Sequence, residues 1–145
     1  MQDLPHRYTA TAQADPIENV AINSANLPQL ASAPPPEFGG PGDQWSPEHL
    51  LAASVADCFI LTFRAIAKAS KLEWTDIQTT AEGVLDREDR VISFTAFTVK
   101  ASLTLPTDAD RDKAQRLLEK SEAACMITNS LKADVHLETE IHVGG

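Results

Sequence analysis

The segment WSPEHLLAASVADCF, from Trp45 to Phe59, constrains the fold more than any other part of the chain. Ser46 can cap the free backbone amides of a helix. Pro47 suits the first helical position because it has no N–H to leave unpaired, and Glu48 puts a negative charge in the first turn, where it is favoured. These residues predict a long helix that begins at Pro47.

This predicted helix is apolar around nearly its whole circumference. Between Leu50 and Phe63 almost every side chain is hydrophobic, and such a helix is expected to be buried on nearly every side. A single thin sheet in a chain of 145 residues cannot cover all of these sides. The sequence therefore predicts that a second protomer covers the remainder in a homodimer.

Composition limits the partners of the protein. The 12 basic and 21 acidic residues give a formal net charge of −9, a field that repels nucleic acid and anionic membranes. The first residues, MQDLPHRYTA, lack the regions of a signal peptide, and no uninterrupted apolar run approaches the roughly 18 residues of a membrane span. We expect a cytoplasmic protein with one domain, residues 1–145, that binds neither nucleic acid nor membrane.

Segments with strand and helix patterns alternate along the rest of the chain. Short strands are expected at 8–14 and 20–22. The proline- and glycine-rich connector at 33–44 can continue neither a helix nor a central strand. A strand at 77–85 leads through a charged turn to a return strand at 91–105.

The return strand and the segments after it carry further signals. Its apolar alternation slips by one residue, which predicts a β-bulge near Ala96–Phe97. A second helix should start at a cap formed by Thr107 or Asp108 and end at Cys125. Its inward face is predicted to consist of Ala114, Leu117, Leu118 and Ala124. A strand with one wet face is expected at 135–143.

The two cysteines, Cys58 and Cys125, can serve chemistry or packing. In a reducing compartment a cysteine pair is redox-active, metal-binding or simply buried, because ordinary disulfides are kept open there. A buried cysteine considered alone is most often a small apolar side chain. The cysteines and histidines lack the short ligand spacings of a structural zinc site, so no metal is expected.

The segments PEFGGPGDQWSPEHLLAASVADCF and EAACMITNSL together resemble the OsmC/Ohr family, the osmotically inducible and organic hydroperoxide resistance proteins. The resemblance implies an α+β, OsmC-like fold with antiparallel sheets around long central helices, in an intertwined homodimer. It also implies a thiol peroxidase in which Cys58 attacks an organic hydroperoxide and Cys125 resolves the product as a disulfide. No bound cofactor is implied, a dihydrolipoyl-type dithiol is the implied reductant, and Glu48 matches the family's acidic site residue.

One residue of the family pattern has no match. The family holds an arginine against the reactive cysteine, whereas this chain has no Lys or Arg between Arg7 and Arg64. Burial raises a thiol pKa. The helix dipole cannot offset this, because Ser46 precedes Cys58 by twelve residues, about 18 Å at about 1.5 Å per residue. We therefore expect a cation near Cys58, with Arg7 as first candidate and with Arg64, another arginine brought by the partner protomer, or His49 as alternatives.

Two functions remain open at this point. The first is the peroxidase just described. The second is a non-catalytic dimer of the same fold that binds a small hydrophobic ligand in the cleft beside Cys58. Asp57 is expected to pair with a backbone amide or a basic side chain at the dimer interface. His136 and His142 share the wet face of the last strand, where a solvated pair is expected.

Overall fold

A computed structural model describes residues 2–144 of the chain. They form two compact units, Met1–Leu50 and Leu51–Gly145. Helix α1, Pro47–Ala69, crosses the boundary, so its first turn belongs to the N-terminal unit and the rest to the C-terminal unit.

The N-terminal unit contains a small antiparallel sheet with the strand order β1-β2-β3. Its strands are β1 (Thr11–Gln13), β2 (Val20–Asn23) and β3 (Leu30–Ser32). The first strand is shorter than the predicted 8–14, and β3 was not predicted because three residues show no alternation. The connector is a loop as predicted, with one short 3-10 helix, η1, at Pro36–Phe38. It returns to the sheet where the Ala33 N–H donates to the Trp45 carbonyl at 2.9 Å.

Helix α1 begins as the sequence predicts. The Ser46 hydroxyl oxygen accepts the N–H of His49 at 3.1 Å, which is the expected side-chain cap. Burial, however, is confined to one stripe with a spacing of four residues: Val55, Phe59, Phe63 and Ala67. The expectation of burial on nearly every side is wrong for the single chain, because the core covers one side only. Leu61, outside the stripe, is 51% exposed.

Helix α1 is also long and apolar enough to cross a membrane, with a mean hydropathy of 1.8 over its best window. The sequence analysis did not predict this length and apolarity, because Asp57 and Arg64 interrupt the apolar run. The mean hydropathy over the window stays high despite these two charged residues. The core helix of a soluble protein has the same composition, and α1 packs its buried stripe into the core of the C-terminal unit.

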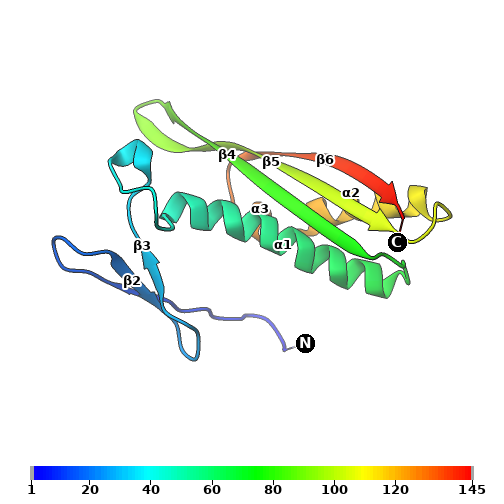
Figure 1. Cartoon of the computed structure of the whole chain (residues 1–145), viewed down its shortest axis with the longest axis horizontal. Coiled ribbons are helices and arrows are strands. Elements are labelled where there is room, and N and C mark those ends of the chain that lie inside the picture. The colour runs from blue at the N-terminus through cyan, green and yellow to red at the C-terminus, as the bar shows by residue number, and fades with distance from the viewer. Residues whose placement is uncertain (1, 145) are drawn as a thin grey trace. The chain divides into compact units, whose positions relative to one another are not determined.

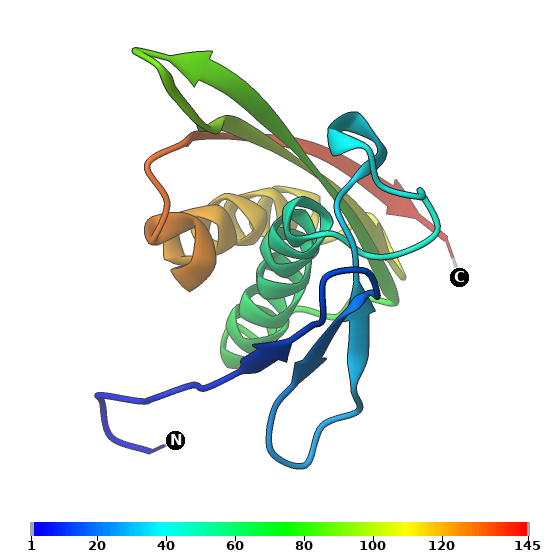
Figure 2. The same ribbon diagram turned by 90° about the vertical axis from the view of Figure 1, so that its left-hand side faces the viewer.

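The C-terminal unit is a three-stranded sheet with helices on one face (Figures 1 and 2). Its strands are β4 (Asp76–Glu88), β5 (Val91–Leu105) and β6 (Asp134–Val143), in the order β4-β5-β6. Strands β4 and β5 form a long antiparallel hairpin. Its turn residues Asp89 and Arg90 both have positive φ, 50° and 70°, as two-residue turns of this kind require.

The third strand corrects the expectation of purely antiparallel sheets, because β6 pairs with β5 in parallel. Between them the chain passes through helices α2 (Arg111–Ala124) and α3 (Met126–Asn129). A crossover of this kind brings the chain back to the sheet in its original direction. It also places α2 and α3 on the helical side of the sheet (Figure 1), and Cys125 lies between these two helices in sequence.

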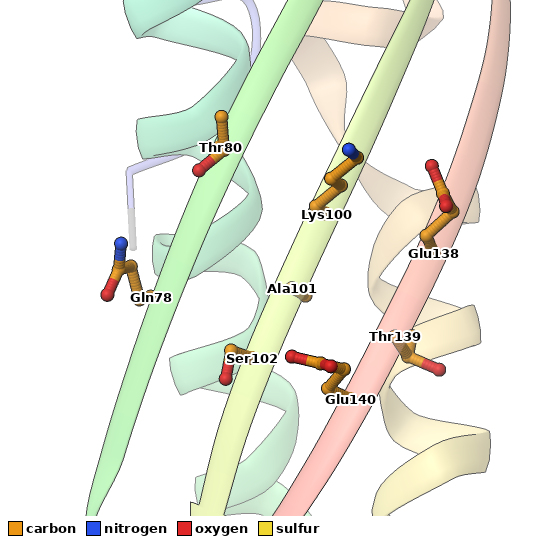
Figure 3. A pocket seen from close by; sticks show the side chains of 8 residues that line it. All are labelled: Gln78, Thr80, Lys100, Ala101, Ser102, Glu138, Thr139 and Glu140. Carbon is orange, nitrogen blue, oxygen red and sulfur yellow. The ribbon is translucent and has the colours of Figure 1, made fainter.

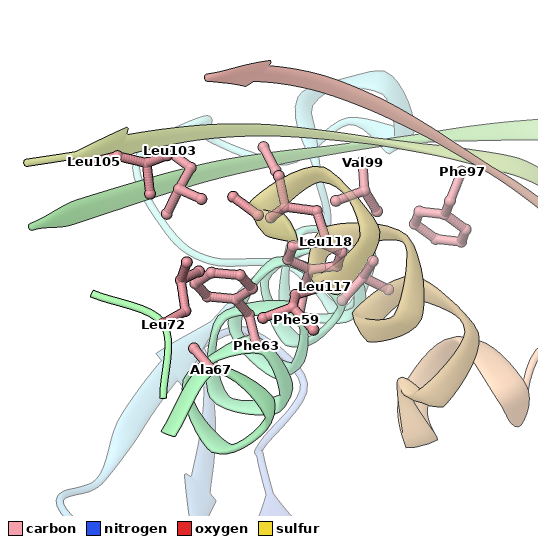
Figure 4. Packing of buried hydrophobic residues seen from close by; sticks show 13 residues of the cluster. Phe59, Phe63, Ala67, Leu72, Phe97, Val99, Leu103, Leu105, Leu117 and Leu118 are labelled. Carbon is pink, nitrogen blue, oxygen red and sulfur yellow. The ribbon is translucent and has the colours of Figure 1, made fainter. Parts of the chain in front are cut away.

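The core of this unit lies between β5 and the helices (Figure 4). The predicted alternation of β5 is confirmed by its buried residues Phe97, Val99, Ala101, Leu103 and Leu105. Val84 pairs with Ala96 and Leu85 with Phe94, so the extra residue of the bulge is Thr95, one position from the prediction. The bulge keeps Phe94 and Phe97 together, with ring centroids 5.1 Å apart.

Helix α2 starts later than predicted. The Thr107 hydroxyl accepts the N–H of Ala109 at 3.4 Å within a turn, and the helix itself begins at Arg111 after Asp110. Its buried face consists of Ala114, Leu117, Leu118 and Ser121. Ala124, predicted to face inward, is exposed, and the inward position at this end of the helix is taken by Ser121 and Cys125.

The opposite face of the sheet is polar (Figure 3). A shallow hollow on this face is lined by Gln78, Thr80, Lys100, Ala101, Ser102, Glu138, Thr139 and Glu140. His136 and His142 are exposed on β6, as predicted, and His142 Nε2 lies 3.6 Å from Glu140 Oε2. This face of the sheet is therefore solvated.

Candidate active site

Cys58 lies in the middle of α1, directly before Phe59 of the buried stripe. This position at the edge of the stripe leaves the thiol half-buried and free, with part of its surface open to solvent. One helical turn later, the Thr62 hydroxyl lies 3.8 Å from the Cys58 sulfur and forms a hydrogen bond with it. The helix thus supplies both the thiol and one of its polar neighbours.

The other neighbours of Cys58 come from the junction of α2 and α3. Cys125 is buried and extended, with φ −66° and ψ 114°, which separates the two helices. The first N–H groups of a helix have no acceptor within it. At the start of α3, the amides of Met126 and Ile127 donate to the Cys58 sulfur, which also forms a hydrogen bond with the Cys125 thiol. The structure therefore brings the two predicted cysteines together.

These contacts change the acidity of the thiol. Burial raises the pKa of Cys58, but the hydrogen bonds outweigh it, and the net pKa lies below the ordinary thiol value. In order of size, the donors are the Ile127 amide, the Cys125 thiol, the Thr62 hydroxyl and the Met126 amide. Each of these groups is neutral, whereas the sequence led us to expect a cation.

Among the described residues, none of the candidate cations forms a hydrogen bond with the Cys58 sulfur. Arg7 is exposed in the N-terminal unit, and Arg64 is exposed six residues after Cys58 on α1. His49 is exposed, and its Nδ1 lies 2.6 Å from the buried Ser46 hydroxyl, so its ring supports the helix cap. A contribution of Arg7 to the thiolate stays a prediction.

Glu48, the third predicted site residue, lies in the first turn of α1 within the N-terminal unit. Ten positions of the helix separate it from Cys58. Its Oε1 atom is buried and has no hydrogen-bond partner among residues 2–144. The structure places the free thiols of Cys58 and Cys125 next to each other, whereas Glu48 belongs to the other unit.

The Cys58 thiol opens into an apolar hollow of about 500 Å³. The hollow is lined by Ser54, Asp57, Cys58, Leu61, Thr62, Ala65, Ile66, Ala124, Met126 and Ile127. One wall is α1 and the other is the α2–α3 junction. The second wall was not predicted from the sequence. The segment EAACMITNSL shows where α2 ends, but it contains no signal for a new helix after Cys125.

Residues 40–140 match the model of a family described as OsmC-like protein. The chain belongs to the OsmC-like family. It is 33% identical over 125 residues to the uncharacterized protein YmaD of Bacillus subtilis (strain 168), covering 84% of this chain and 83% of that protein. It is also 27% identical over 96 residues to Peroxiredoxin OsmC of Escherichia coli (strain K12), covering 66% of each.

A solved structure agrees with this membership. The crystal structure of an organic hydroperoxide resistance protein OsmC from Legionella pneumophila superposes with a TM-score of 0.76 at 25% identity, covering 97% of this chain and 99% of that one. The OsmC-like α+β fold predicted from the sequence is thus confirmed.

Thr62 offers a direct check on the hydrogen bonds to the thiol. Thr62→Val keeps the shape of the side chain and removes the hydroxyl, so the pKa of Cys58 should rise. Because thiolate is the reactive form, the rate of Cys58 alkylation by iodoacetamide at pH 7 should fall by about twofold to fivefold, the effect of a neutral hydrogen bond. Thr62→Ser keeps the hydroxyl and should restore the rate. Equal rates for the Val and Ser variants would contradict the assignment.

Proposed function

We propose that this protein is a two-cysteine thiol peroxidase that reduces organic hydroperoxides. The observation that carries the proposal is the Cys58 thiol, whose pKa is lowered by the donors of residues 125–127 and which opens into an apolar hollow. Peroxide reduction requires a thiolate at neutral pH and a second thiol nearby. The names of two relatives, a peroxiredoxin and an organic hydroperoxide resistance protein, support the same chemistry.

The proposed reaction has three steps. The Cys58 thiolate attacks the outer oxygen of ROOH, the O–O bond breaks, and the alkoxide takes up a proton to leave as ROH, with Cys58 oxidised to a sulfenic acid. The Cys125 thiol attacks that sulfur and expels water, which forms a disulfide. A dithiol of the dihydrolipoyl type then reduces the disulfide by exchange, regenerating both thiols and leaving the reductant as a cyclic disulfide.

The hollow favours a carbon-containing peroxide over hydrogen peroxide. Leu61, Ile66, Met126 and Ile127 give it apolar walls, and apolar surface removed from water contributes about 25 cal/mol per Å². An alkyl or aryl group can use this surface, whereas hydrogen peroxide cannot. We place the protein in the cytoplasm, where dithiol reductants keep such a pair cycling.

Thiol counting tests the proposal. One equivalent of cumene hydroperoxide should remove both thiols within seconds to minutes and form an intramolecular Cys58–Cys125 disulfide, whereas hydrogen peroxide should react more slowly. Cys125→Ser should stop at a Cys58 sulfenic acid, which dimedone traps, and Cys58→Ser should leave Cys125 unoxidised. Slow, non-stoichiometric loss of thiols in the wild-type protein would rule out the peroxidase.

The apolar lining also supports a second function, a non-catalytic protein that binds a small hydrophobic ligand beside Cys58. This alternative predicts that an apolar fluorescent probe binds reversibly with unchanged affinity in Cys58→Ser. A probe that reduces the alkylation rate of Cys58 in the absence of peroxide turnover would favour it over the enzyme.

We further propose that the protein is an intertwined homodimer. Outside the buried stripe, α1 leaves Leu61 half-exposed. The end of the β4–β5 hairpin extends beyond the rest of its unit (Figure 2) and exposes Leu85 and Ile92. Two-stranded ends of this kind are marginal in water without further packing. In a homodimer, the exposed part of α1 and the hairpin end of one copy would pack against the other copy.

Sedimentation tests the homodimer. The wild-type protein should sediment as a dimer at micromolar concentration. Ile92→Glu places a charge on the hairpin surface and should shift the equilibrium toward the monomer. Val143→Glu introduces the same charge at an exposed position of β6 and should leave the monomer–dimer equilibrium unchanged. A wild-type monomer at micromolar concentration would contradict the proposal.

A further inference from the structure

Helix α3 is a single turn of four residues, Met126–Asn129, and contacts outside it must set its orientation. Helices shorter than about 12 residues are marginal in water by themselves, because few hydrogen bonds offset the cost of starting them. The extended backbone of Cys125 also interrupts the helix between α2 and α3. The direction of the first N–H groups of α3, which donate to the Cys58 sulfur, therefore depends on how α3 is held.

One side chain reaches back across this interruption. Asn129 Nδ2, at the last position of α3, donates to the Ala123 carbonyl in the last turn of α2 at 3.2 Å. The last four carbonyls of a helix have no donor within it, so the Asn129 carboxamide satisfies a group that α2 itself leaves free. Among residues 2–144, no other hydrogen bond joins α3 to α2. The hydrogen bonds of the neighbouring side chains, from Thr128 to the Cys125 carbonyl and from Ser130 to the Met126 carbonyl, stay within this segment.

We propose that Asn129 is a positioning residue for the candidate site, because its side chain holds α3 in the orientation that directs the α3 amides and the Cys125 thiol toward the Cys58 sulfur. Cys125 is the residue at which the two helices diverge, and the donating amides follow it directly. A rotation of α3 away from α2 would therefore move all of these groups together. The inference rests on the proposed function only for its role in peroxide reduction, since the acidity of Cys58 and the reach of Cys125 are measurable without peroxide.

Matched variants separate the hydrogen bond from other properties of the side chain. Asn129→Leu keeps the branched shape and removes the donor, Asn129→Ala is a second variant without it, and Asn129→Gln keeps a carboxamide. All of these replacements are neutral and at least as favourable in a helix as asparagine, so the charge of Asp57, which lines the hollow, is unaffected. Ser130→Ala is the control, because the Ser130 hydroxyl donates to the Met126 carbonyl at 2.8 Å without reaching α2.

Alkylation of Cys58 by iodoacetamide measures the direction of the amides. If they turn away from the sulfur, the pKa of Cys58 rises, so the pH–rate curve of Asn129→Leu should move to higher pH with its plateau unchanged. The rate at pH 7 should fall by about twofold to fivefold, the effect of losing one neutral hydrogen bond. Asn129→Ala should behave in the same way. Asn129→Gln should recover most of the rate, and Ser130→Ala should follow the wild-type curve.

Thiol exchange with less than one equivalent of the aromatic disulfide DTNB measures the reach of Cys125. The Cys58 thiolate attacks the disulfide of the reagent and releases one thionitrobenzoate. Cys125 then attacks the Cys58 sulfur of the mixed disulfide, forms the protein disulfide and releases the second thionitrobenzoate. This second, first-order release should slow by about twofold to fivefold in Asn129→Leu, be largely restored in Asn129→Gln, and keep the wild-type rate in Ser130→Ala.

Each outcome decides the inference. Unchanged curves and release rates in both Asn129→Leu and Asn129→Ala would overturn it, and a lower urea midpoint alone would then show that Asn129 only stabilises the fold. Changes in Ser130→Ala as large as those in Asn129→Leu would also overturn it, because they would not depend on the hydrogen bond to α2. If cumene hydroperoxide oxidises neither thiol while Asn129→Leu shifts the pH–rate curve, the proposed peroxidase fails and the positioning role of Asn129 stands.

Discussion

Met126→Pro is expected to slow the alkylation of Cys58 by iodoacetamide at pH 7 by about twofold to threefold, because the Met126 amide is the smallest of the four donors that lower the pKa of the thiol. Proline has no N–H, so the substitution removes one amide that donates to the Cys58 sulfur. The backbone can accept it: Met126 is the first residue of α3, a position that suits proline, and Cys125 before it is already extended.

The pH dependence identifies the cause. The pKa of Cys58 is lowered in the wild-type protein, so the alkylation rate should rise and reach its plateau at a lower pH than for a free cysteine. Met126→Pro should move the rise to higher pH and leave the plateau nearly unchanged. Met126→Ala, which removes the exposed side chain and keeps the N–H, should follow the wild-type curve. A proline variant that also follows it would show that the Met126 amide does not stabilise the thiolate.

The second large effect is on stability. Gly83→Ala is expected to lower the free energy of unfolding by about 1–3 kcal/mol, the usual result of forcing a methyl group into a filled core. A Cβ atom at this position would lie 2.5 Å from Cε1 of Phe97 and 2.9 Å from Cε1 of Phe94. Phe97 is fully buried and therefore cannot swing away from the added methyl group. The strand must shift instead.

Urea denaturation measures this loss. The midpoint should fall at constant slope, since the surface exposed on unfolding barely changes. Glu82→Ala, at the neighbouring exposed position of β4, controls for the effect of alanine in this strand and should change stability by less than about 0.5 kcal/mol. If Gly83→Ala is as stable as the control, the two phenylalanine rings are less tightly placed than the structure shows.

Local signals in the sequence were sufficient for much of the fold. The cap at Ser46 located the start of α1, and the alternation from Phe97 to Leu105 located the buried face of β5 and its bulge to within one residue. These features depend on neighbours within a few positions. The parallel pairing of β6 depends on the path of the whole crossover, which no local period records.

For the same reason, only part of the candidate site could be predicted from the sequence. Cys58 and Cys125 could be singled out because thiols are rare and chemically distinctive. The amides of Met126 and Ile127 could not, since every residue except proline has a backbone N–H and only the fold decides which ones are free. The search for a charged side chain therefore overlooked the neutral backbone donors that lower the pKa of Cys58.

The position of Cys125 directly before Met126 and Ile127 has a consequence for how this protein can vary. Three consecutive residues supply the second thiol and two of the donors to the first. Side chains at 126 and 127 can change without loss of the amides, but one inserted or deleted residue rotates the following helix by about 100°. We therefore expect positions 126 and 127 to tolerate substitution while the length of the segment stays fixed. A single change in length would both raise the pKa of Cys58 and move Cys125 away from the Cys58 sulfur.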